Sequence, residues 1–228
     1  MQLFPKSQFR LAVDFSPRQK TYAVSKDFAD EAQACFARCG VRTLRLALDR
    51  PFNTPLCESL VPEIRKFVAG WMRSNPCYDI YSCATGCRVP TGLKPAREDM
   101  AARWAKPVLF AETVQQMYAD GYRVFLEVGP RGLMTTAVSD TLRGEPHAAL
   151  ALNSIHRRGE LQLQHAVGQF VALGAKMDVS RVFVRRNARL LDFDSTLLPG
   201  GGRYAQMRLS RSLPRLTLFS NESILQPA

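Results

Sequence analysis

The chain has 228 residues, of which 46% are hydrophobic and 22% are charged, a composition typical of a globular protein with one large domain or one domain and a smaller lobe. No apolar run is long enough to span a membrane, and the N-terminus lacks the apolar segment of a secretory signal, so we expect a cytoplasmic protein without a membrane role. The net charge of +11 is spread along the chain without a dense basic block, which favours acidic partners and makes nucleic acid unlikely.

The first 50 residues predict a small lobe. Short strands are expected over 9–15 and 20–25, joined by a tight proline turn into a hairpin. A helix over 27–39 follows, and the alternating leucines of 42–48 predict a half-buried strand. This β-β-α-β order is three quarters of a ferredoxin-like lobe, which we place at residues 1–50.

The next region, residues 51–183, predicts alternating strands and helices. We expect helices at 57–73, 98–105, 109–120, 131–142 and 159–173, and strands at 79–83, 124–128 and 148–152. The last two strands are apolar runs, the first interrupted only by Glu127, and such runs are typical of buried parallel strands. Alternating strands and helices therefore predict an α/β fold with a parallel sheet. Residues 184–228 are rich in arginine and contain a proline-glycine run, so they predict a basic linker or docking tail rather than a further domain.

The cysteines and histidines predict no metal site. Two pairs of cysteines have the spacing C-x3-C, but the three histidines lie far downstream of them, and metal ligands have to converge. We therefore expect reduced thiols. The six residues are Cys35, Cys39, Cys57, Cys77, Cys83 and Cys87.

Six short motifs, in order and spacing, carry a resemblance to a known family. They are FSPRQ at 15–19, PFNTPL at 51–56, YSCATG at 81–86, WAKPVLF at 104–110, FLEVGPRG at 125–132 and NSIHR at 153–157. Together they resemble the C-terminal portion of the malonyl-CoA:carrier-protein acyltransferase domains of iterative polyketide and polyunsaturated fatty acid synthases. The resemblance implies an α/β fold, namely a partial acyltransferase domain with an α/β-hydrolase-like parallel sheet and a partial ferredoxin-like lobe.

The resemblance also implies a reaction. In that family a serine in a G-x-S-x-G turn attacks malonyl-CoA, a histidine accepts the serine proton, and the malonyl group passes to the phosphopantetheine thiol of an acyl carrier protein. No bound cofactor is implied. The 228 residues contain no G-x-S-x-G, so the expected partners are a carrier protein and a missing N-terminal acyltransferase half or adjacent synthase domains.

The resemblance assigns site residues in this chain. The family's histidine position holds Asn53, an amide that cannot accept a proton near neutral pH. The assigned residues are Asn53, Arg103 through a backbone carbonyl turned toward the histidine position, and the pocket residues Pro51, Phe52, Gly129 and Pro130. Taken without the resemblance, Asn53 between two prolines is an ordinary loop residue, and Gly129-Pro130 is ordinary turn chemistry. Ser82 and Cys83 end a strand without a glycine elbow, so they are interpreted as packing residues.

Two functions remain open from the sequence. The first is a fragment of an acyltransferase domain that moves malonyl groups and is inactive alone, because it lacks the serine. The second is a non-catalytic interaction module that binds an acyl carrier protein or a synthase partner by charge steering. Asn53 is the feature that favours the second function over the first.

Overall fold

The computed structural model describes residues 9–48, 50–182, 184, 216–217 and 226–227. Its contacts divide the chain into a unit that ends at Val179 and a unit that begins at Ser180. The second unit contains most of the short helix η4 (Val179–Val182) and a pair of two-residue strands, β8 (Leu216–Thr217) and β9 (Gln226–Pro227). Most of the predicted basic tail, 184–228, lies outside the described residues.

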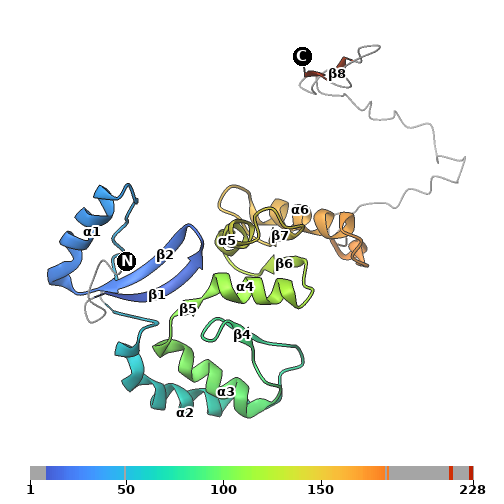
Figure 1. Ribbon diagram of the computed structural model, residues 1–228. Helices are drawn as coiled ribbons and strands as arrows, with labels where there is room; N and C mark the ends of the chain where they lie inside the picture. The colour runs from blue at the N-terminus through green and yellow to red at the C-terminus, as the bar shows by residue number, and fades with distance from the viewer. Residues whose placement is uncertain (1–8, 49, 183, 185–215, 218–225, 228) are drawn as a thin grey trace, which may run out of the picture. The chain divides into compact units, whose positions relative to one another are not determined.

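The predicted hairpin is confirmed. Strands β1 (Phe9–Ser16) and β2 (Gln19–Val24) pair antiparallel around a two-residue turn. The one-turn helix η1 (Lys26–Phe28) and α1 (Ala29–Arg38) follow (Figure 1). Gly40 then ends the helix in the left-handed region, with φ 71°, where a residue without a Cβ carries no steric penalty.

The predicted strand over 42–48 is wrong for this structure. The segment is irregular, and the leucines that were expected to face a core are exposed, with Leu44 at 84% and Leu48 at 63% of their possible surface. An alternating pattern indicates a strand only where another strand offers backbone hydrogen bonds. Within the described residues no strand pairs with this segment, so its backbone does not form a ladder.

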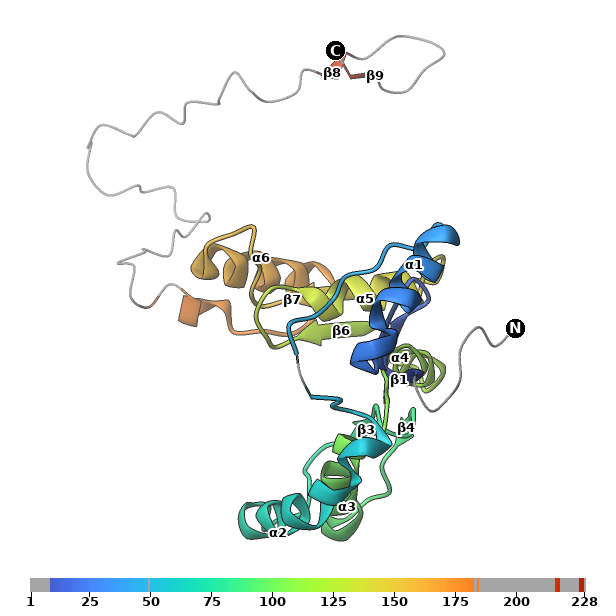
Figure 2. The same cartoon turned by 90° about the vertical axis from the view of Figure 1, so that its left-hand side faces the viewer.

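Two helices and a short hairpin form the next part of the fold. The helices η2 (Pro55–Leu60) and α2 (Val61–Trp71) replace the single predicted helix. Strands β3 (Tyr81–Ser82) and β4 (Cys87–Arg88) pair antiparallel, and α3 (Leu93–Ala102) runs directly into η3 (Arg103–Ala105). Helices α2 and α3 lie side by side in both views (Figures 1 and 2).

A side-chain contact fixes this helix pair. The Arg97 guanidinium donates hydrogen bonds to the Met72 carbonyl, at 2.9 Å from Nε and 2.6 Å from Nη2, and so satisfies the backbone at the end of α2. The apolar pattern of the sequence predicts that Leu60, Ile64, Phe67, Val68 and Trp71 face inward from this helix. That prediction is partly wrong, because Val68 is buried but Phe67 and Trp71 are exposed.

The remaining elements are two parallel strand pairs and the helices that follow their strands. Strand β5 (Val108–Leu109) pairs parallel with β1 and leads into α4 (Phe110–Ala119). Strands β6 (Val124–Glu127) and β7 (Ala148–Ala151) pair parallel over four residues, separated by α5 (Leu133–Thr141) and followed by α6 (Gly159–Ala172). These parallel pairs confirm the predicted α/β class.

The core of this part is small. Val114 of α4 packs with Val138 and Leu142 at the end of α5, and Phe110 and Phe125 cover the cluster. Strand β6 was expected to be buried, and this is wrong, because Val124 and Leu126 are exposed at 43% and 40%. Among the described residues β6 pairs only with β7, so its second edge is unpaired, and the face that carries Val124 and Leu126 is partly exposed.

Candidate functional site

The loop that holds Asn53 is built by local hydrogen bonds. The Thr54 side chain has no exposed surface, and its Oγ1 donates to the Pro51 carbonyl at 2.7 Å. The buried Cys57 thiol lies 3.4 Å from the same carbonyl, and the Cys57 amide donates to the Thr54 carbonyl at 3.0 Å. These bonds turn the backbone back on itself, and Asn53 adopts a left-handed conformation with φ 59°, a region in which asparagine and histidine are enriched.

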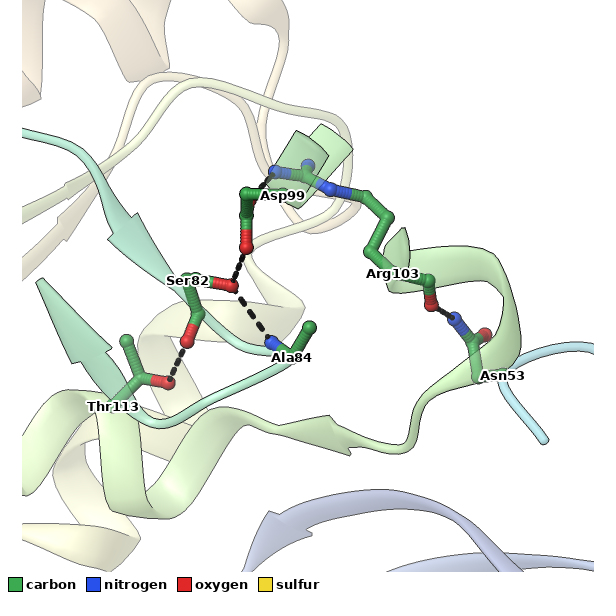
Figure 3. Close-up of polar contacts among 6 residues, drawn as sticks. All are labelled: Asn53, Ser82, Ala84, Asp99, Arg103 and Thr113. Carbon is green, nitrogen blue, oxygen red and sulfur yellow. Dashed lines mark hydrogen bonds and ion pairs between the residues drawn. The ribbon is translucent and has the colours of Figure 1, made fainter. Parts of the chain in front are cut away.

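The structure brings Asn53 and Arg103 together. The Asn53 side-chain Nδ2 donates to the Arg103 backbone carbonyl at 3.1 Å, and the Asn53 backbone amide donates to the Trp104 carbonyl at 3.1 Å (Figure 3). Phe52 meets the Trp104 ring edge-on, with 6.2 Å between ring centroids. Two successive carbonyls of η3 therefore fix both the backbone and the side chain of Asn53.

The Arg103 segment is held from its other side by Asp99. The Arg103 amide donates to the Asp99 carbonyl, and the Arg103 Nη2 lies 2.7 Å from the Asp99 Oδ2. The second carboxylate oxygen of Asp99 accepts a hydrogen bond from the Ser82 hydroxyl (Figure 3). A chain of contacts thus runs from the end of β3, across α3, to the loop of Asn53.

Ser82 has the surroundings of a structural residue. Its side chain is 1% exposed, its hydroxyl donates to Asp99 and accepts the Ala84 amide at 3.1 Å, and its carbonyl accepts from Thr113 at 3.5 Å. A nucleophilic hydroxyl needs a base and access to substrate. Ser82 is buried, so its hydroxyl has no access to a substrate, and its contact with Asp99 is part of the internal packing.

The turn at Gly129-Pro130 is organised separately from Asn53. Glu127, at the end of β6, accepts the Leu133 and Thr135 amides at 3.1 and 2.9 Å, so its carboxylate binds the free amides at the start of α5. Arg131 has φ 82° in this turn. Among the described residues, no hydrogen bond joins Gly129 or Pro130 to Asn53 or Arg103.

The FSPRQ motif places a second polar cluster at the end of the hairpin. The Ser16 hydroxyl donates to Asp140 of α5 at 2.7 Å, and Arg143 and Arg18 lie 3.1 and 3.5 Å from the same carboxylate. The hydrogen bond from Ser16 and the two guanidinium groups hold the pKa of Asp140 below its ordinary value. An open groove of about 500 Å³ lies beside this cluster.

Sequence reasoning missed three of these residues. Asp99 was visible only as the i−4 neighbour of Arg103, a spacing that permits a helix-surface ion pair. Ser82 was interpreted as a packing residue, and its contact with Asp99 spans 17 positions. Glu127 interrupts an apolar run just before a turn, which is the signal that a carboxylate caps the next helix.

Within the described residues no group of three potential ligands could hold a metal ion. All six cysteines are free thiols. None of the helices described here has the length and apolar content of a membrane span.

The sequence is similar to parts of polyketide and polyunsaturated fatty acid synthases. The chain is 29% identical over 184 residues to the spectinabilin polyketide synthase system protein NorA' of Streptomyces orinoci, covering 79% of this chain and 5% of that protein. It is 24% identical over 166 residues to a polyunsaturated fatty acid synthase component of Thraustochytrium, covering 71% of this chain and 6% of that protein. No family model matches.

Solved structures of acyltransferases have a similar fold to this chain. The acyltransferase domain from the second module of the salinomycin polyketide synthase matches with a TM-score of 0.65 at 21% identity, covering 78% of this chain and 42% of that domain. A malonyl-transacylase solved with its acyl carrier protein matches with a TM-score of 0.61 at 20% identity. The match covers 72% of this chain and 51% of that structure's chain.

The fold therefore defines the class: an α/β protein with the architecture of acyltransferase domains. Its relatives are polyketide and polyunsaturated fatty acid synthases, which confirms the resemblance drawn from the motifs. The chain spans a tenth or less of these synthases and about half or less of the matched structures.

Proposed function

We propose that this chain forms the base-side part of an acyltransferase site, which moves a malonyl group from CoA to the phosphopantetheine thiol of an acyl carrier protein in the cytoplasm. The serine nucleophile comes from a segment outside these 228 residues. With Asn53 at the base position, transfer by the assembled site is slow.

The observation that carries the proposal is the hydrogen bond from Asn53 Nδ2 to the Arg103 carbonyl. A histidine that donates Nδ1–H to a carbonyl is held in one tautomer, with Nε2 free to accept a proton. The Asn53 amide makes a donor contact of this kind from the histidine position. Its conformation, φ 59°, is also one that histidine adopts more readily than most residues.

The chemistry explains why the amide matters. When a serine oxygen attacks the thioester carbonyl of malonyl-CoA, it loses its proton, and a neutral base has to accept that proton as the bond forms. An asparagine amide has no basic nitrogen. General-base assistance contributes about 10²–10⁴ in rate, so a site assembled around Asn53 is slower by roughly that factor.

The exposed side chains of β6 support the proposal that a segment outside these 228 residues completes the fold. Parallel sheets are normally covered on both faces and paired at interior strands, whereas Val124, Leu126 and Val128 of this region are all exposed. A segment that pairs with the free edge of β6 and packs on this face would bury these side chains. The matched acyltransferase domain from the salinomycin synthase is more than twice as long as the region matched here.

A first experiment tests for the nucleophile. The chain alone and a fusion of it behind the serine-bearing N-terminal part of the salinomycin second-module acyltransferase domain are incubated with radiolabelled malonyl-CoA. We expect no covalent label on the chain alone and label on the fusion carrying Asn53→His. A fusion with its serine replaced by alanine is the control and stays unlabelled.

Two outcomes would overturn the proposal. Stable label on the chain alone would place a nucleophile within these 228 residues. An unlabelled, folded Asn53→His fusion would mean that this part of the fold does not support acyl transfer.

The alternative function, a non-catalytic module that binds an acyl carrier protein, is favoured by Asn53 itself and by the net charge of +11. One of the matched folds was solved in complex with a carrier. If binding without transfer is the function, titration of the chain with an acidic carrier protein gives a complex that weakens as salt is raised. In that case the Asn53→His fusion shows no malonyl transfer.

A further inference from the structure

We propose that Ser82 and Asp99 are positioning residues, which hold the Arg103 carbonyl toward the side chain at position 53. The two residues would form a supporting layer of the proposed site, so their functional meaning rests on the proposed function. The hydrogen bond from Asn53 Nδ2 to the Arg103 carbonyl would then depend on two side chains that do not contact residue 53.

Asp99 contacts Arg103 at two places. Its carbonyl accepts the Arg103 amide, and its carboxylate binds the Arg103 guanidinium at 2.7 Å. The Arg103 Nε is buried and has no hydrogen-bond partner in the part of the chain that the structure describes, so Asp99 is the group that orients this guanidinium there. Rotation of Arg103 about its backbone would move the carbonyl that Asn53 binds, and the two contacts oppose that rotation.

The position of Asp99 also needs an explanation. It lies in the last turn of α3 (Leu93–Ala102), where the carbonyl end of the helix disfavours a negative charge. The Arg103 guanidinium and the Ser82 hydroxyl offset this cost, one at each carboxylate oxygen (Figure 3). Both contacts therefore stabilise Asp99 at this position.

Ser82 attaches this chain of contacts to a strand. Its side chain is buried, and it sits on β3, whose end is tied to β5 by a 2.6 Å hydrogen bond from the Leu109 amide to the Cys83 carbonyl. Strand backbone is a firmer support than a surface loop, because its hydrogen bonds limit local opening. The Ser82–Asp99–Arg103 contacts thus connect the loop of Asn53 to the strands.

The test reads the Asn53 amide directly by NMR on the full 228-residue chain, labelled with ¹⁵N. The side-chain resonances are assigned with Asn53→Ala. In Asp99→Asn we expect the hydrogen-bonded Asn53 proton to move toward the shift of a free amide and to exchange about fivefold faster or more, as loss of one such bond implies. The matched control is Asp120→Asn, because Asp120 accepts a hydrogen bond from Tyr81, the neighbour of Ser82 on β3; there the Asn53 signal stays in place.

A second pair of variants separates positioning from simple packing. Ser82→Thr keeps the hydroxyl, whereas Ser82→Val replaces it with a methyl group on a side chain of the same shape as threonine. We expect the Asn53 signal to be retained in the threonine variant and displaced in the valine variant. If Asp99→Asn does not fold, this pair decides the question.

The positioning role is wrong if the Asn53 amide is unchanged in a folded Asp99→Asn or Ser82→Val chain. A second signature comes from Asn53→His, whose imidazole should hold its proton on Nδ1 with Asp99 present and mix tautomers in Asp99→Asn. Neither measurement needs malonyl-CoA, so a failure of acyl transfer in the fusion and a failure of this chain of contacts are distinguishable.

Discussion

The loop of Asn53 and strand β6 lie in the same compact unit, yet their surroundings are opposite. The Asn53 loop is closed by a hydrogen bond from the Thr54 hydroxyl to the Pro51 carbonyl, and two carbonyls of η3 fix its backbone and side chain. Strand β6 pairs on one side only among the described residues, and its side chains Val124 and Leu126 are exposed. The difference shows that the geometry of the Asn53 loop is fixed by this chain's own contacts, whereas β6 leaves apolar side chains uncovered among the described residues.

The largest loss of stability is expected when a buried apolar side chain is truncated, and a smaller loss when an exposed one is truncated. Leu142→Ala, in the cluster with Val114 and Val138, should lower the free energy of unfolding by about 2–5 kcal/mol, because it leaves a cavity. Leu126→Ala on β6 should cost less than about 1 kcal/mol, because that side chain is already 40% exposed. Urea unfolding measures both. Equal costs would mean that β6 is covered in solution.

A smaller effect tests the closed loop. Asn53→Ala should destabilise the chain by about 1–2 kcal/mol, because alanine is strained at a left-handed φ and the bond to the Arg103 carbonyl is lost. Asn53→Gly loses the same side-chain bond but relieves the backbone, so it should be the more stable of the two variants. An alanine variant as stable as the glycine variant would contradict the left-handed conformation. Thermal unfolding followed by circular dichroism gives the comparison.

The smallest effect concerns Asp140, which links α5 to the hairpin. Its pKa is lowered from an ordinary value of 3.8 by the Ser16 hydrogen bond and by Arg143 and Arg18. A carboxyl group with a lowered folded-state pKa stabilises the protein above its unfolded pKa, and this contribution is lost as pH falls through the folded value. Asp140→Asn should therefore be less stable than the unmodified chain at about pH 6, and the difference should shrink as pH falls below about 3.8. A difference independent of pH in urea unfolding would contradict the charge contact.

Much of the fold was predictable because local patterns carry it. The Ser16-Pro17 turn between short apolar runs predicted the β1–β2 hairpin, and the run at 124–128 predicted a parallel strand. Burial was not predictable in the same way. A strand pattern states which side chains would face a neighbour, and the exposed leucines of 42–48 show that the neighbour also has to be present.

In the candidate site, too, some residues were predictable from the sequence and others were not. Asn53 lies within a motif and Arg103 directly precedes one, so the resemblance could assign both, and the structure places them in contact. Asp99 and Ser82 were not predicted as a unit, because their contact depends on how α3 packs against β3 and not on any spacing in the sequence. Pocket roles for Pro51, Phe52, Gly129 and Pro130 stay predictions.

The most direct measurement of the central claim, that Asn53 occupies a base position, is the rate of malonyl transfer to a carrier protein by the serine-bearing fusion with Asn53 and with histidine at that position. We predict that Asn53→His raises the rate by about 10²–10⁴, the contribution of a general base, while Asn53→Gln leaves it unchanged. Equal rates for the Asn53 and histidine fusions, both folded, would contradict the claim.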